Sequence, residues 1–430
     1  MIVRVLAPRG RLFLLFLFVL LVLAIGGTAA IGKELPDEPI DSGLATPELI
    51  QLAYDAGEIS DGERLLYLAY AVYEYQSLPA RYQGSVGWYG TSTVLELDRA
   101  FAKIAKGNGP GAADSVQQEL VRMEEIAGTV CDVDDGANEL ESTHFHLNYE
   151  TIEGGLSAQN YLDQLETAYA VEIGDYSWPM PPLCTITAGC SADNPWGKYP
   201  VQTNDLGTDY GYVTTGGGNF TGVIGDNPNT GETEPDAEAS CMVLHSDFSQ
   251  IGSSGPMANL SVTTAHEYFH AIHFGIGFPD LLEPQMWTES MAAFVEDEVQ
   301  DGVNDNHQYL YPDFKYCLGE WPDAGSSEYA NWLFFRYAAE RHGGTNTSGG
   351  GEEITQSFLR YAAQQQTGFQ AMESALNSKG TDLSEFFHDY AIATRFMLSC
   401  PNGGSFCYEE ASEYIGAKGP VENNADLSPY

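Results

Sequence analysis

Two histidines and two glutamates of this 430-residue chain have the types and spacing of a metal-dependent hydrolytic site. His266 and His270 enclose Glu267 in the segment H-E-Y-F-H, and Glu289 follows 19 residues after the second histidine. Positions i and i+4 share one face of a helix, so both imidazoles can bind the same ion. With Glu289 as third ligand, a tetrahedral Zn²⁺ keeps one open position, and Glu267 can take a proton from an attacking water. The pattern predicts one catalytic Zn²⁺ with Glu267 as general base.

The elements that must position these residues are also visible in the sequence. Apolar residues recur at spacings of three and four through residues 261–274, and a Gly-Ile-Gly segment follows, which predicts a helix that ends there. A second predicted helix, over 286–299, carries Glu289 beside small residues. Two plainer interpretations exist: the histidines satisfy hydrogen bonds inside a buried helix, or Glu289 is a surface acid near a helix N-terminus. Chance predicts only about 0.03 H-E-x-x-H matches in a chain of this composition, which favours the metal site.

These segments resemble the gluzincin group of metallopeptidases, in which a glutamate in a W-x-E-[S/G]-x-A setting follows H-E-x-x-H at this distance. The metzincin pattern fails, because it needs Gly and His where this chain has His273 and Ile276. A closer resemblance is to a family of secreted bacterial and archaeal metallopeptidases named after a myxobacterial prototype. It covers about residues 45–400 and is most specific in three segments, 266–275, 287–299 and 303–310. The resemblance implies zinc peptidase chemistry on peptide or protein substrates.

One position departs from better-studied gluzincins. Many of them have an aspartate four residues after the third ligand, and it orients a zinc-bound imidazole. Here that position is Ala293. By helical phase, Glu296 or Asp297 can take this role, although each could also be an ordinary solvated acid.

A peptidase also needs a donor for the oxyanion that forms during peptide hydrolysis. Tyr329, in a predicted helix over 326–343, is the candidate catalytic residue for this role. Three other side chains compete with it: His342, His307 and Tyr268. Nothing identifies a group that would bind a free substrate amine, so an endopeptidase is favoured over an aminopeptidase. The alternative from another class is a catalytically silent extracellular binding protein with a zincin fold.

The N-terminus indicates export. Arg4, Arg9 and Arg11 precede an apolar stretch over 12–25, and small residues follow up to Ala30. This is the pattern of a signal peptide, or alternatively of an uncleaved membrane anchor. We expect a signal peptide or anchor over 1–30, a helical, propeptide-like region over 31–135, a zincin-like metallopeptidase domain over 136–410 and a flexible tail over 411–430.

The expected fold class is α+β. The catalytic domain would combine a mixed sheet, the H-E-x-x-H helix and a helical subdomain, after a mostly helical N-terminal region. Alternation predicts strands at 144–149, 199–202, 210–214 and 241–245. A helix start is predicted at Thr46-Pro47-Glu48, and helical patterns occupy 61–75, 92–105, 112–128, 157–171 and much of 353–398. A strand near 241–247 followed by the H-E-x-x-H helix resembles the edge-strand arrangement of zincins, in which an extended peptide substrate adds beside the strand, so the resemblance implies a sheet edge here.

The charge balance restricts the partners. There are 61 acidic and 18 basic residues, a formal net charge of −43, which argues against nucleic acid and anionic membrane surfaces. Such a surface suits a salty medium, where repulsion is screened. Two acidic segments, 132–141 and 226–238, are candidate Ca²⁺ sites or simply solvated loops. His144 and His146 form an H-x-H pair that indicates either a metal site or ordinary histidines on a strand surface.

The seven cysteines fit an exported, disulfide-bonded protein better than a thiolate metal site. Cys184 with Cys190, and Cys400 with Cys407, are close enough in sequence for local disulfides. Three cysteines remain, so one is free or pairs between chains: Cys131, Cys241 and Cys317.

Overall fold

Helices with an apolar period near 3.6 and short alternating strands follow one another along the chain, as the sequence predicts. The computed structural model describes residues 43–132, 138–186, 190–249, 251–252, 254–278, 285–310, 328–344, 352–399 and 405–418. All of them belong to one compact unit, Pro39–Tyr430. The predicted signal peptide or anchor, residues 1–30, lies outside the described residues.

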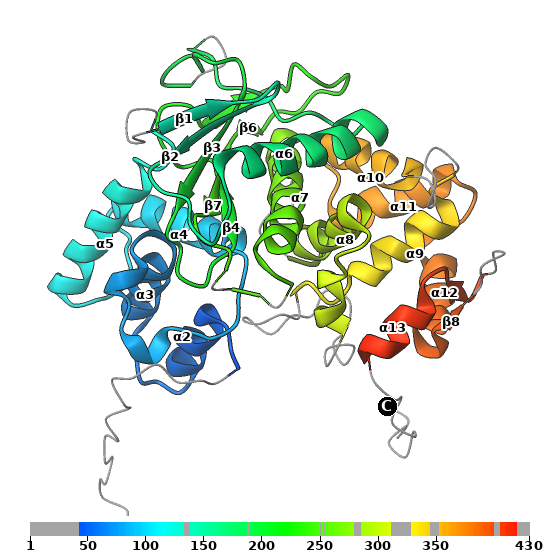
Figure 1. Ribbon diagram of the computed structural model, residues 1–430, viewed down its shortest axis with the longest axis horizontal. Helices are drawn as coiled ribbons and strands as arrows, with labels where there is room; N and C mark the ends of the chain where they lie inside the picture. The colour runs from blue at the N-terminus through cyan, green and yellow to red at the C-terminus, as the bar shows by residue number, and fades with distance from the viewer. Residues whose placement is uncertain are drawn as a thin grey trace, which may run out of the picture. The chain divides into compact units, whose positions relative to one another are not determined.

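The central element is a five-stranded mixed sheet with the order β1-β2-β3-β7-β4 (Figure 1). Its strands are β1 (Asn138–Glu141), β2 (Phe145–Tyr149), β3 (Tyr199–Asn204), β4 (Gly211–Thr214) and β7 (Cys241–His245). β2, β3 and β7 are parallel, whereas β1 and β4 pair antiparallel at the two edges. Two small sheets pair β5 (Gly222–Gly225) with β6 (Ala237–Ala239), and β8 (Leu398–Ser399) with β9 (Cys407–Tyr408). The mixed sheet among many helices confirms the α+β class.

The helices up to α12 agree with the periodic segments of the sequence. In chain order they are α2 (Thr46–Asp55), α3 (Asp61–Tyr73), α4 (Thr91–Ala105), α5 (Asp114–Ala127), α6 (Ala158–Tyr169), α7 (Pro256–Gly275), α8 (Glu289–Gln300), α9 (Trp332–His342), α10 (Glu353–Ala363), α11 (Gly368–Ser378), α12 (Leu383–Phe396) and α13 (Ala411–Lys418). Single 3₁₀ or π turns are η1 (Tyr75–Ser77), η2 (Ala80–Tyr82), η3 (Ala170–Asp175), η5 (Gln285–Trp287) and η6 (Asp305–Leu310). The predicted metal helix is therefore present and begins five residues earlier than expected.

Both faces of the sheet are covered by helices, because successive residues of a strand point to opposite sides. On β7, Met242 and Leu244 belong to the core shared with α6, α7 and α8. Cys241 and Val243 belong to the core shared with α3, α4 and α5. In Figure 1 the N-terminal helices and α7 accordingly lie on either side of β4 and β7. The helices of the N-terminal region thus form one layer of the same unit as the sheet.

The expectation that β7 is the edge strand is wrong. β7 lies between β3 and β4, and all five of its residues are buried. β4 is the edge strand instead, and part of its outer side is already hydrogen-bonded: Gly90 N donates to Gly211 O at 2.9 Å, and Tyr210 N, just before the strand, donates to Trp88 O at 2.8 Å. The outer edge of such a strand carries backbone N–H and C=O groups that no further strand can pair with. Residues 88–90 cover part of this edge.

The C-terminal end is also more ordered than expected. Residues 411–418, placed in a flexible tail by the sequence, form α13. The reason is packing: Tyr414 is fully buried, and its ring centroid lies 5.3 Å from that of Trp332 and 5.8 Å from that of Tyr408. Residues 419–430 lie outside the described part of the chain.

Two disulfides are present among the described residues. Cys184 pairs with Cys190, as predicted, and Cys131 pairs with Cys241, which joins the end of the N-terminal helical region to β7. Cys407 is also disulfide-bonded, and its predicted partner Cys400 lies outside the described residues, as does Cys317. Such pairs fit an oxidising compartment.

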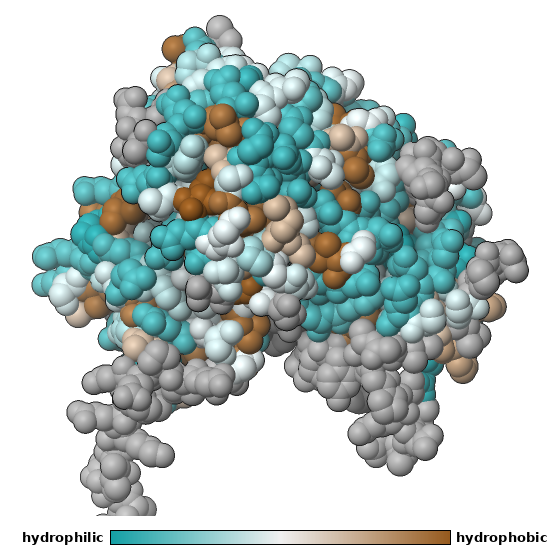
Figure 2. Space-filling view, in the orientation of Figure 1, coloured by the Kyte–Doolittle hydropathy of each residue, from teal (hydrophilic) through white to brown (hydrophobic). Residues whose placement is uncertain are grey.

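The face of the molecule in Figure 2 is largely hydrophilic, with scattered hydrophobic residues, in keeping with the net charge of −43. Within the described residues, no helix combines the length and apolar character that a bilayer span requires.

Candidate metal centre

The metal site predicted from the sequence lies where α7 packs against α8. α7 is buried over its last 17 residues, from Asn259 to Gly275, so it crosses the core and presents side chains to elements on every side. His266 and His270 lie one turn apart on it, and Glu289 is the first residue of α8. All three side chains are at most 1% exposed.

Three donor atoms meet in this buried space. His266 Nε2 lies 3.1 Å from His270 Nε2, and Glu289 Oε2 lies 3.3 Å from each of these nitrogens. Ligand atoms about 2.0–2.1 Å from a tetrahedral zinc ion lie roughly 3.3–3.4 Å from one another. The three observed distances match that spacing, so these residues can hold a metal ion. This is the one group of at least three potential metal-ligating side chains found in the described part of the chain.

The protonation of His266 supports the same conclusion. Its Nδ1 lies 2.7 Å from Oε1 of Glu296, a side chain that is 1% exposed. Burial raises the pKa of Glu296 well above its ordinary value. In its ionised form Glu296 accepts from Nδ1–H of His266, and that tautomer leaves the lone pair of Nε2 facing Glu289 and His270. Burial lowers the pKa of His266 to about 4, so its imidazole is neutral near pH 7. Facing lone pairs and a carboxylate are the donor set that a divalent cation stabilises.

The partner of His266 resolves one alternative left by the sequence. Glu296 occupies the position next to the imidazole, whereas Asp297 faces Arg336, with its Oδ2 3.6 Å from a guanidinium nitrogen. Glu296 lies seven residues after Glu289, two helical turns along α8, so it projects from the same face. Glu296, three residues after Ala293, thus provides the carboxylate beside His266.

Glu267 lies on α7 beside the three ligands, and its two oxygens are in different environments. Thr91 Oγ1 donates to Oε2 at 2.7 Å, while Oε1 has no hydrogen-bond partner among the described residues. The side chain is 0% exposed. Burial raises the pKa of Glu267 well above its ordinary value, and the Thr91 hydrogen bond opposes this only in part. A carboxylate with a raised pKa accepts protons more readily, as a general base requires.

Aromatic rings enclose the imidazole of His266. The ring of Tyr89 stacks on it, with a centroid distance of 3.8 Å and an angle of 6°. The ring of Tyr329 lies 5.9 Å from His266 and 5.7 Å from Tyr89. Tyr329 lies just before α9 instead of inside a helix. Burial, and after it the nearby Glu328 and Glu289 carboxylates, raise the pKa of Tyr329 well above 10, so its hydroxyl stays protonated.

The three competitors of Tyr329 have other ring neighbours. His342 contacts Phe386, His307 contacts Trp332 and Tyr414, and Tyr268 packs among Phe145, Tyr169 and Tyr199. Among the four candidates for the oxyanion donor, Tyr329 is the one whose ring lies beside a histidine of the candidate metal site within the described residues.

Two residues of the site had no signal in the sequence. Thr91 and Tyr89 come from the N-terminal helical region, 176 and 177 residues before the residues that they contact. The sequence showed only a helix start near 92 and one tyrosine among 25. No local spacing connects them with the H-E-x-x-H segment, so only the tertiary fold reveals them.

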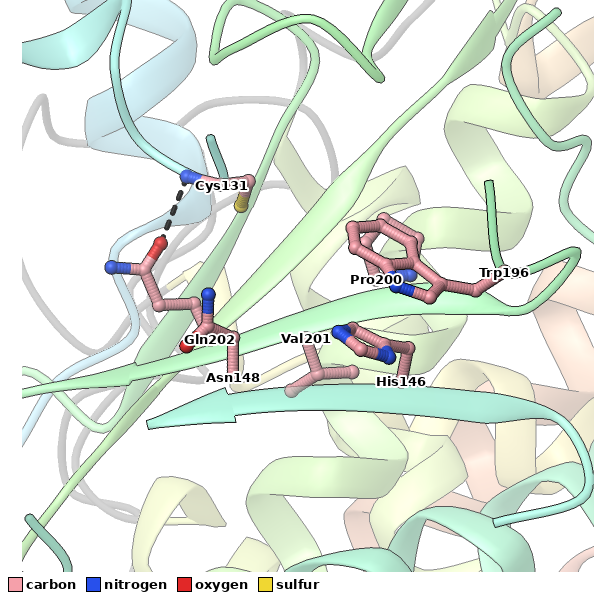
Figure 3. Close-up of a pocket in the computed structure, with 7 residues that line it drawn as sticks. All are labelled: Cys131, His146, Asn148, Trp196, Pro200, Val201 and Gln202. Carbon is pink, nitrogen blue, oxygen red and sulfur yellow. Dashed lines mark hydrogen bonds between the residues drawn. The ribbon is translucent and has the colours of Figure 1, made fainter. Parts of the chain in front are cut away.

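The other metal-site candidates do not assemble a ligand set. His144 stacks on Tyr169 with its Nδ1 2.7 Å from Glu166, and His146 stacks on Trp196. Figure 3 shows that His146 and Trp196 line a pocket. Phe145 and Leu147 of β2 face the core that contains α7, so His146 points to the opposite face of the sheet. Neither histidine joins a group of three ligands in the described chain.

The acidic segments expected as alternative Ca²⁺ sites contain strands β1 and β6. In the second segment, Glu234 is fully buried and accepts hydrogen bonds from Thr230 Oγ1 and Asn227 N. These bonds tie the loop together internally. Neither segment contributes to a three-ligand group within the described residues, and residues 133–137 lie outside them.

No family model, curated protein or solved structure matches the chain. The chemistry of the buried cluster is therefore the basis for a functional assignment.

Proposed function

We propose that the protein is an exported zinc-dependent peptidase of the gluzincin type, with a zincin-like catalytic domain. The observation that carries this proposal is the convergence of His266, His270 and Glu289 at 3.1–3.3 Å, with Glu267 on the adjacent position of α7. Two imidazoles and one carboxylate are a ligand set of catalytic zinc. The resemblance of the 266–310 segment to secreted metallopeptidases supports the same family.

Each residue around the cluster would have a separate role in peptide hydrolysis. Zn²⁺, when bound, supplies a Lewis acid that polarises the scissile carbonyl and lowers the pKa of water toward ~7. Glu267 accepts the proton of the attacking water at Oε1 and passes it to the leaving amine. The hydroxyl of Tyr329 donates to the oxyanion that forms on the carbonyl oxygen when the water attacks the carbonyl carbon. Glu296 keeps the imidazole of His266 in the tautomer that binds metal.

The surroundings of the cluster define how a substrate reaches it. The ligands and Glu267 are at most 1% exposed, and Tyr89 covers one face of His266. A peptide therefore gains access only when covering residues are displaced. A site closed to water strengthens the electrostatic interactions within it. The disulfides and the acidic surface support action outside the cell, on protein or peptide substrates.

The proposal is tested with Glu267→Gln in the purified chain. We expect one zinc ion per chain in both proteins, hydrolysis of casein by the wild type, and loss of that hydrolysis in the variant. A chelator should abolish wild-type activity, and added zinc should restore it. Activity that persists with the chelator, or in Glu267→Gln, contradicts the mechanism. A wild type that binds zinc but hydrolyses no peptide supports the alternative, a silent binding protein.

A further inference from the structure

We propose that Thr91, in the N-terminal helical region, is a positioning residue that holds Glu267 by one carboxylate oxygen. This inference rests on the proposed function and extends the site to a part of the chain that the sequence placed in a propeptide-like region. The inference follows from two consecutive hydrogen bonds that join the edge strand β4, the first residue of α4 and Glu267 on α7.

The hydrogen-bond chain has a fixed direction. Val213 N on β4 donates to Thr91 Oγ1 at 2.8 Å, and Thr91 Oγ1 lies 2.7 Å from Oε2 of Glu267. A backbone N–H can only donate, so the hydroxyl accepts from Val213 and its own hydrogen is available for the carboxylate. Thr91 is 1% exposed and Glu267 is 0% exposed, so little water competes for either bond. The hydroxyl therefore acts as a fixed donor to Glu267.

The consequence is an asymmetric carboxylate. Oε2 of Glu267 is anchored by Thr91, whereas Oε1 is buried with no hydrogen-bond partner in the described chain. Rotation of the carboxylate would break the bond to Thr91, so the anchor keeps Oε1 in one direction. Proton transfer requires the base within hydrogen-bond reach of the water, and small displacements of a catalytic group are costly. Because Oε2 is held by Thr91, Oε1 is the oxygen of Glu267 that can accept the proton.

The backbone before Thr91 is itself held against β4. Trp88 pairs with Asp209, and Gly90 N donates to Gly211 O at 2.9 Å. A Cβ atom at Gly90 would lie 2.3 Å from Asp209 Oδ2, so a larger residue would push this segment away. Thr91 then begins α4, which packs against β4 on the side opposite α7 (Figure 1). The position of the hydroxyl is thus fixed by backbone contacts.

The N-terminal helical region would then be a permanent part of the catalytic unit. A removable propeptide leaves a complete active site behind, whereas loss of the segment around Thr91 would release Glu267. The disulfide between Cys131 and Cys241 also ties the end of this region to β7. We therefore expect the active mature chain to retain residue 91.

The test compares Thr91→Val with Thr91→Ser in the full-length chain loaded with zinc. Valine keeps the shape and removes the donor, whereas serine keeps the donor. We expect kcat on a casein-derived peptide to fall by about 10–100-fold in Thr91→Val, with KM and zinc content unchanged. Thr91→Ser should recover most of the loss. Thr93→Val, a buried threonine on the same helix, serves as control and should match the wild type.

A second measurement does not depend on turnover. Acetohydroxamic acid offers an N–OH proton to a carboxylate beside the metal, so its affinity reports the placement of Glu267. We expect weaker binding in Thr91→Val and Glu267→Gln, and near wild-type binding in Thr91→Ser. Equal hydroxamate affinity in Thr91→Val and the wild type would overturn the role of Thr91, as would a serine variant as impaired as valine. A wild type that binds the hydroxamate but hydrolyses no peptide would refute the peptidase function alone.

Discussion

Oε1 of Glu296 lies 2.7 Å from Nδ1 of His266, whose Nε2 faces Glu289 on the other side of the ring. One helix therefore supplies both carboxylates that contact this imidazole, from positions seven residues apart. A carboxylate bound to the remote nitrogen of a metal-binding histidine fixes the ring orientation and makes the ligand nitrogen more basic.

The first prediction concerns this contact. Glu296→Ala should lower the affinity for zinc by about 10–100-fold, because the imidazole loses its orientation and part of its basicity. Glu296→Gln keeps an acceptor without charge and should give an intermediate loss. Competition with a chelating dye measures the dissociation constants. Asp301→Ala, an exposed acid at the end of the same helix, should bind zinc like the wild type. Unchanged affinity in Glu296→Ala would show that the contact does not support the metal.

The second prediction assigns the oxyanion donor. Tyr329→Phe should retain zinc and lower kcat by about 10²–10³-fold, the loss typical of one oxyanion donor. Tyr268→Phe is the matched control, because Tyr268 is equally buried but packs against Phe145, away from the cluster. Steady-state kinetics on one peptide substrate compares the two variants. If Tyr268→Phe is the slower enzyme, or Tyr329→Phe is as fast as the wild type, another group stabilises the oxyanion.

The sequence predicts which segments form helices and strands better than it predicts which of these elements lie next to one another in the folded chain. The helices carrying His266 and Glu289 were visible because a buried helix repeats its apolar residues every three to four positions. The grouping of His266, His270 and Glu289 follows from the four-residue spacing of the histidines along α7 and the 19 residues between His270 and Glu289. The strand at 241–245 was correctly found but wrongly placed at the edge, because pairing order is set by contacts far apart in the chain. Thr91 was missed for the same reason.

The third prediction concerns the disulfide that ties the N-terminal helical region to the sheet. Cys131 and Cys241 are 110 residues apart, whereas Cys184 and Cys190 are six apart. In the chain-entropy model a longer closed loop restricts the unfolded chain more, here by about 2–3 kcal/mol between the two disulfides. Changing both Cys131 and Cys241 to Ser should therefore lower the free energy of unfolding by about 4–5 kcal/mol, and the Cys184 and Cys190 pair by clearly less. Denaturant titration without reductant measures both. Equal losses would argue against this loop-length effect.

A buried ionic cluster carries the fourth prediction. The Arg336 guanidinium lies between carboxylates of α8, α9 and the C-terminal segment, with Glu410 at 3.0 Å, Glu340 at 3.5 Å and Asp297 at 3.6 Å. Glu298 also contacts it. Arg341 adds a second cation, with a guanidinium nitrogen 3.2 Å from Glu340. Two cations cannot neutralise four acids, so some of the acids are more stable with a proton. Burial raises the pKa of Glu340 to about 7, although Arg336 lowers it in part.

The sign of the pH dependence follows from this shift. Glu340 binds a proton more tightly in the folded chain than in the unfolded chain, so folding stability falls as the pH rises from about 4.5 toward 7. One such group contributes a slope of at most about 1.4 kcal/mol per pH unit in that window. Glu340→Gln cannot titrate and should make the slope shallower by up to that amount, in denaturant unfolding between pH 5.5 and 7. Glu125→Gln, an exposed acid of α5, makes the same change in net charge and should keep the wild-type slope. If both variants show the same slope, general charge repulsion, and not Glu340, sets the pH dependence.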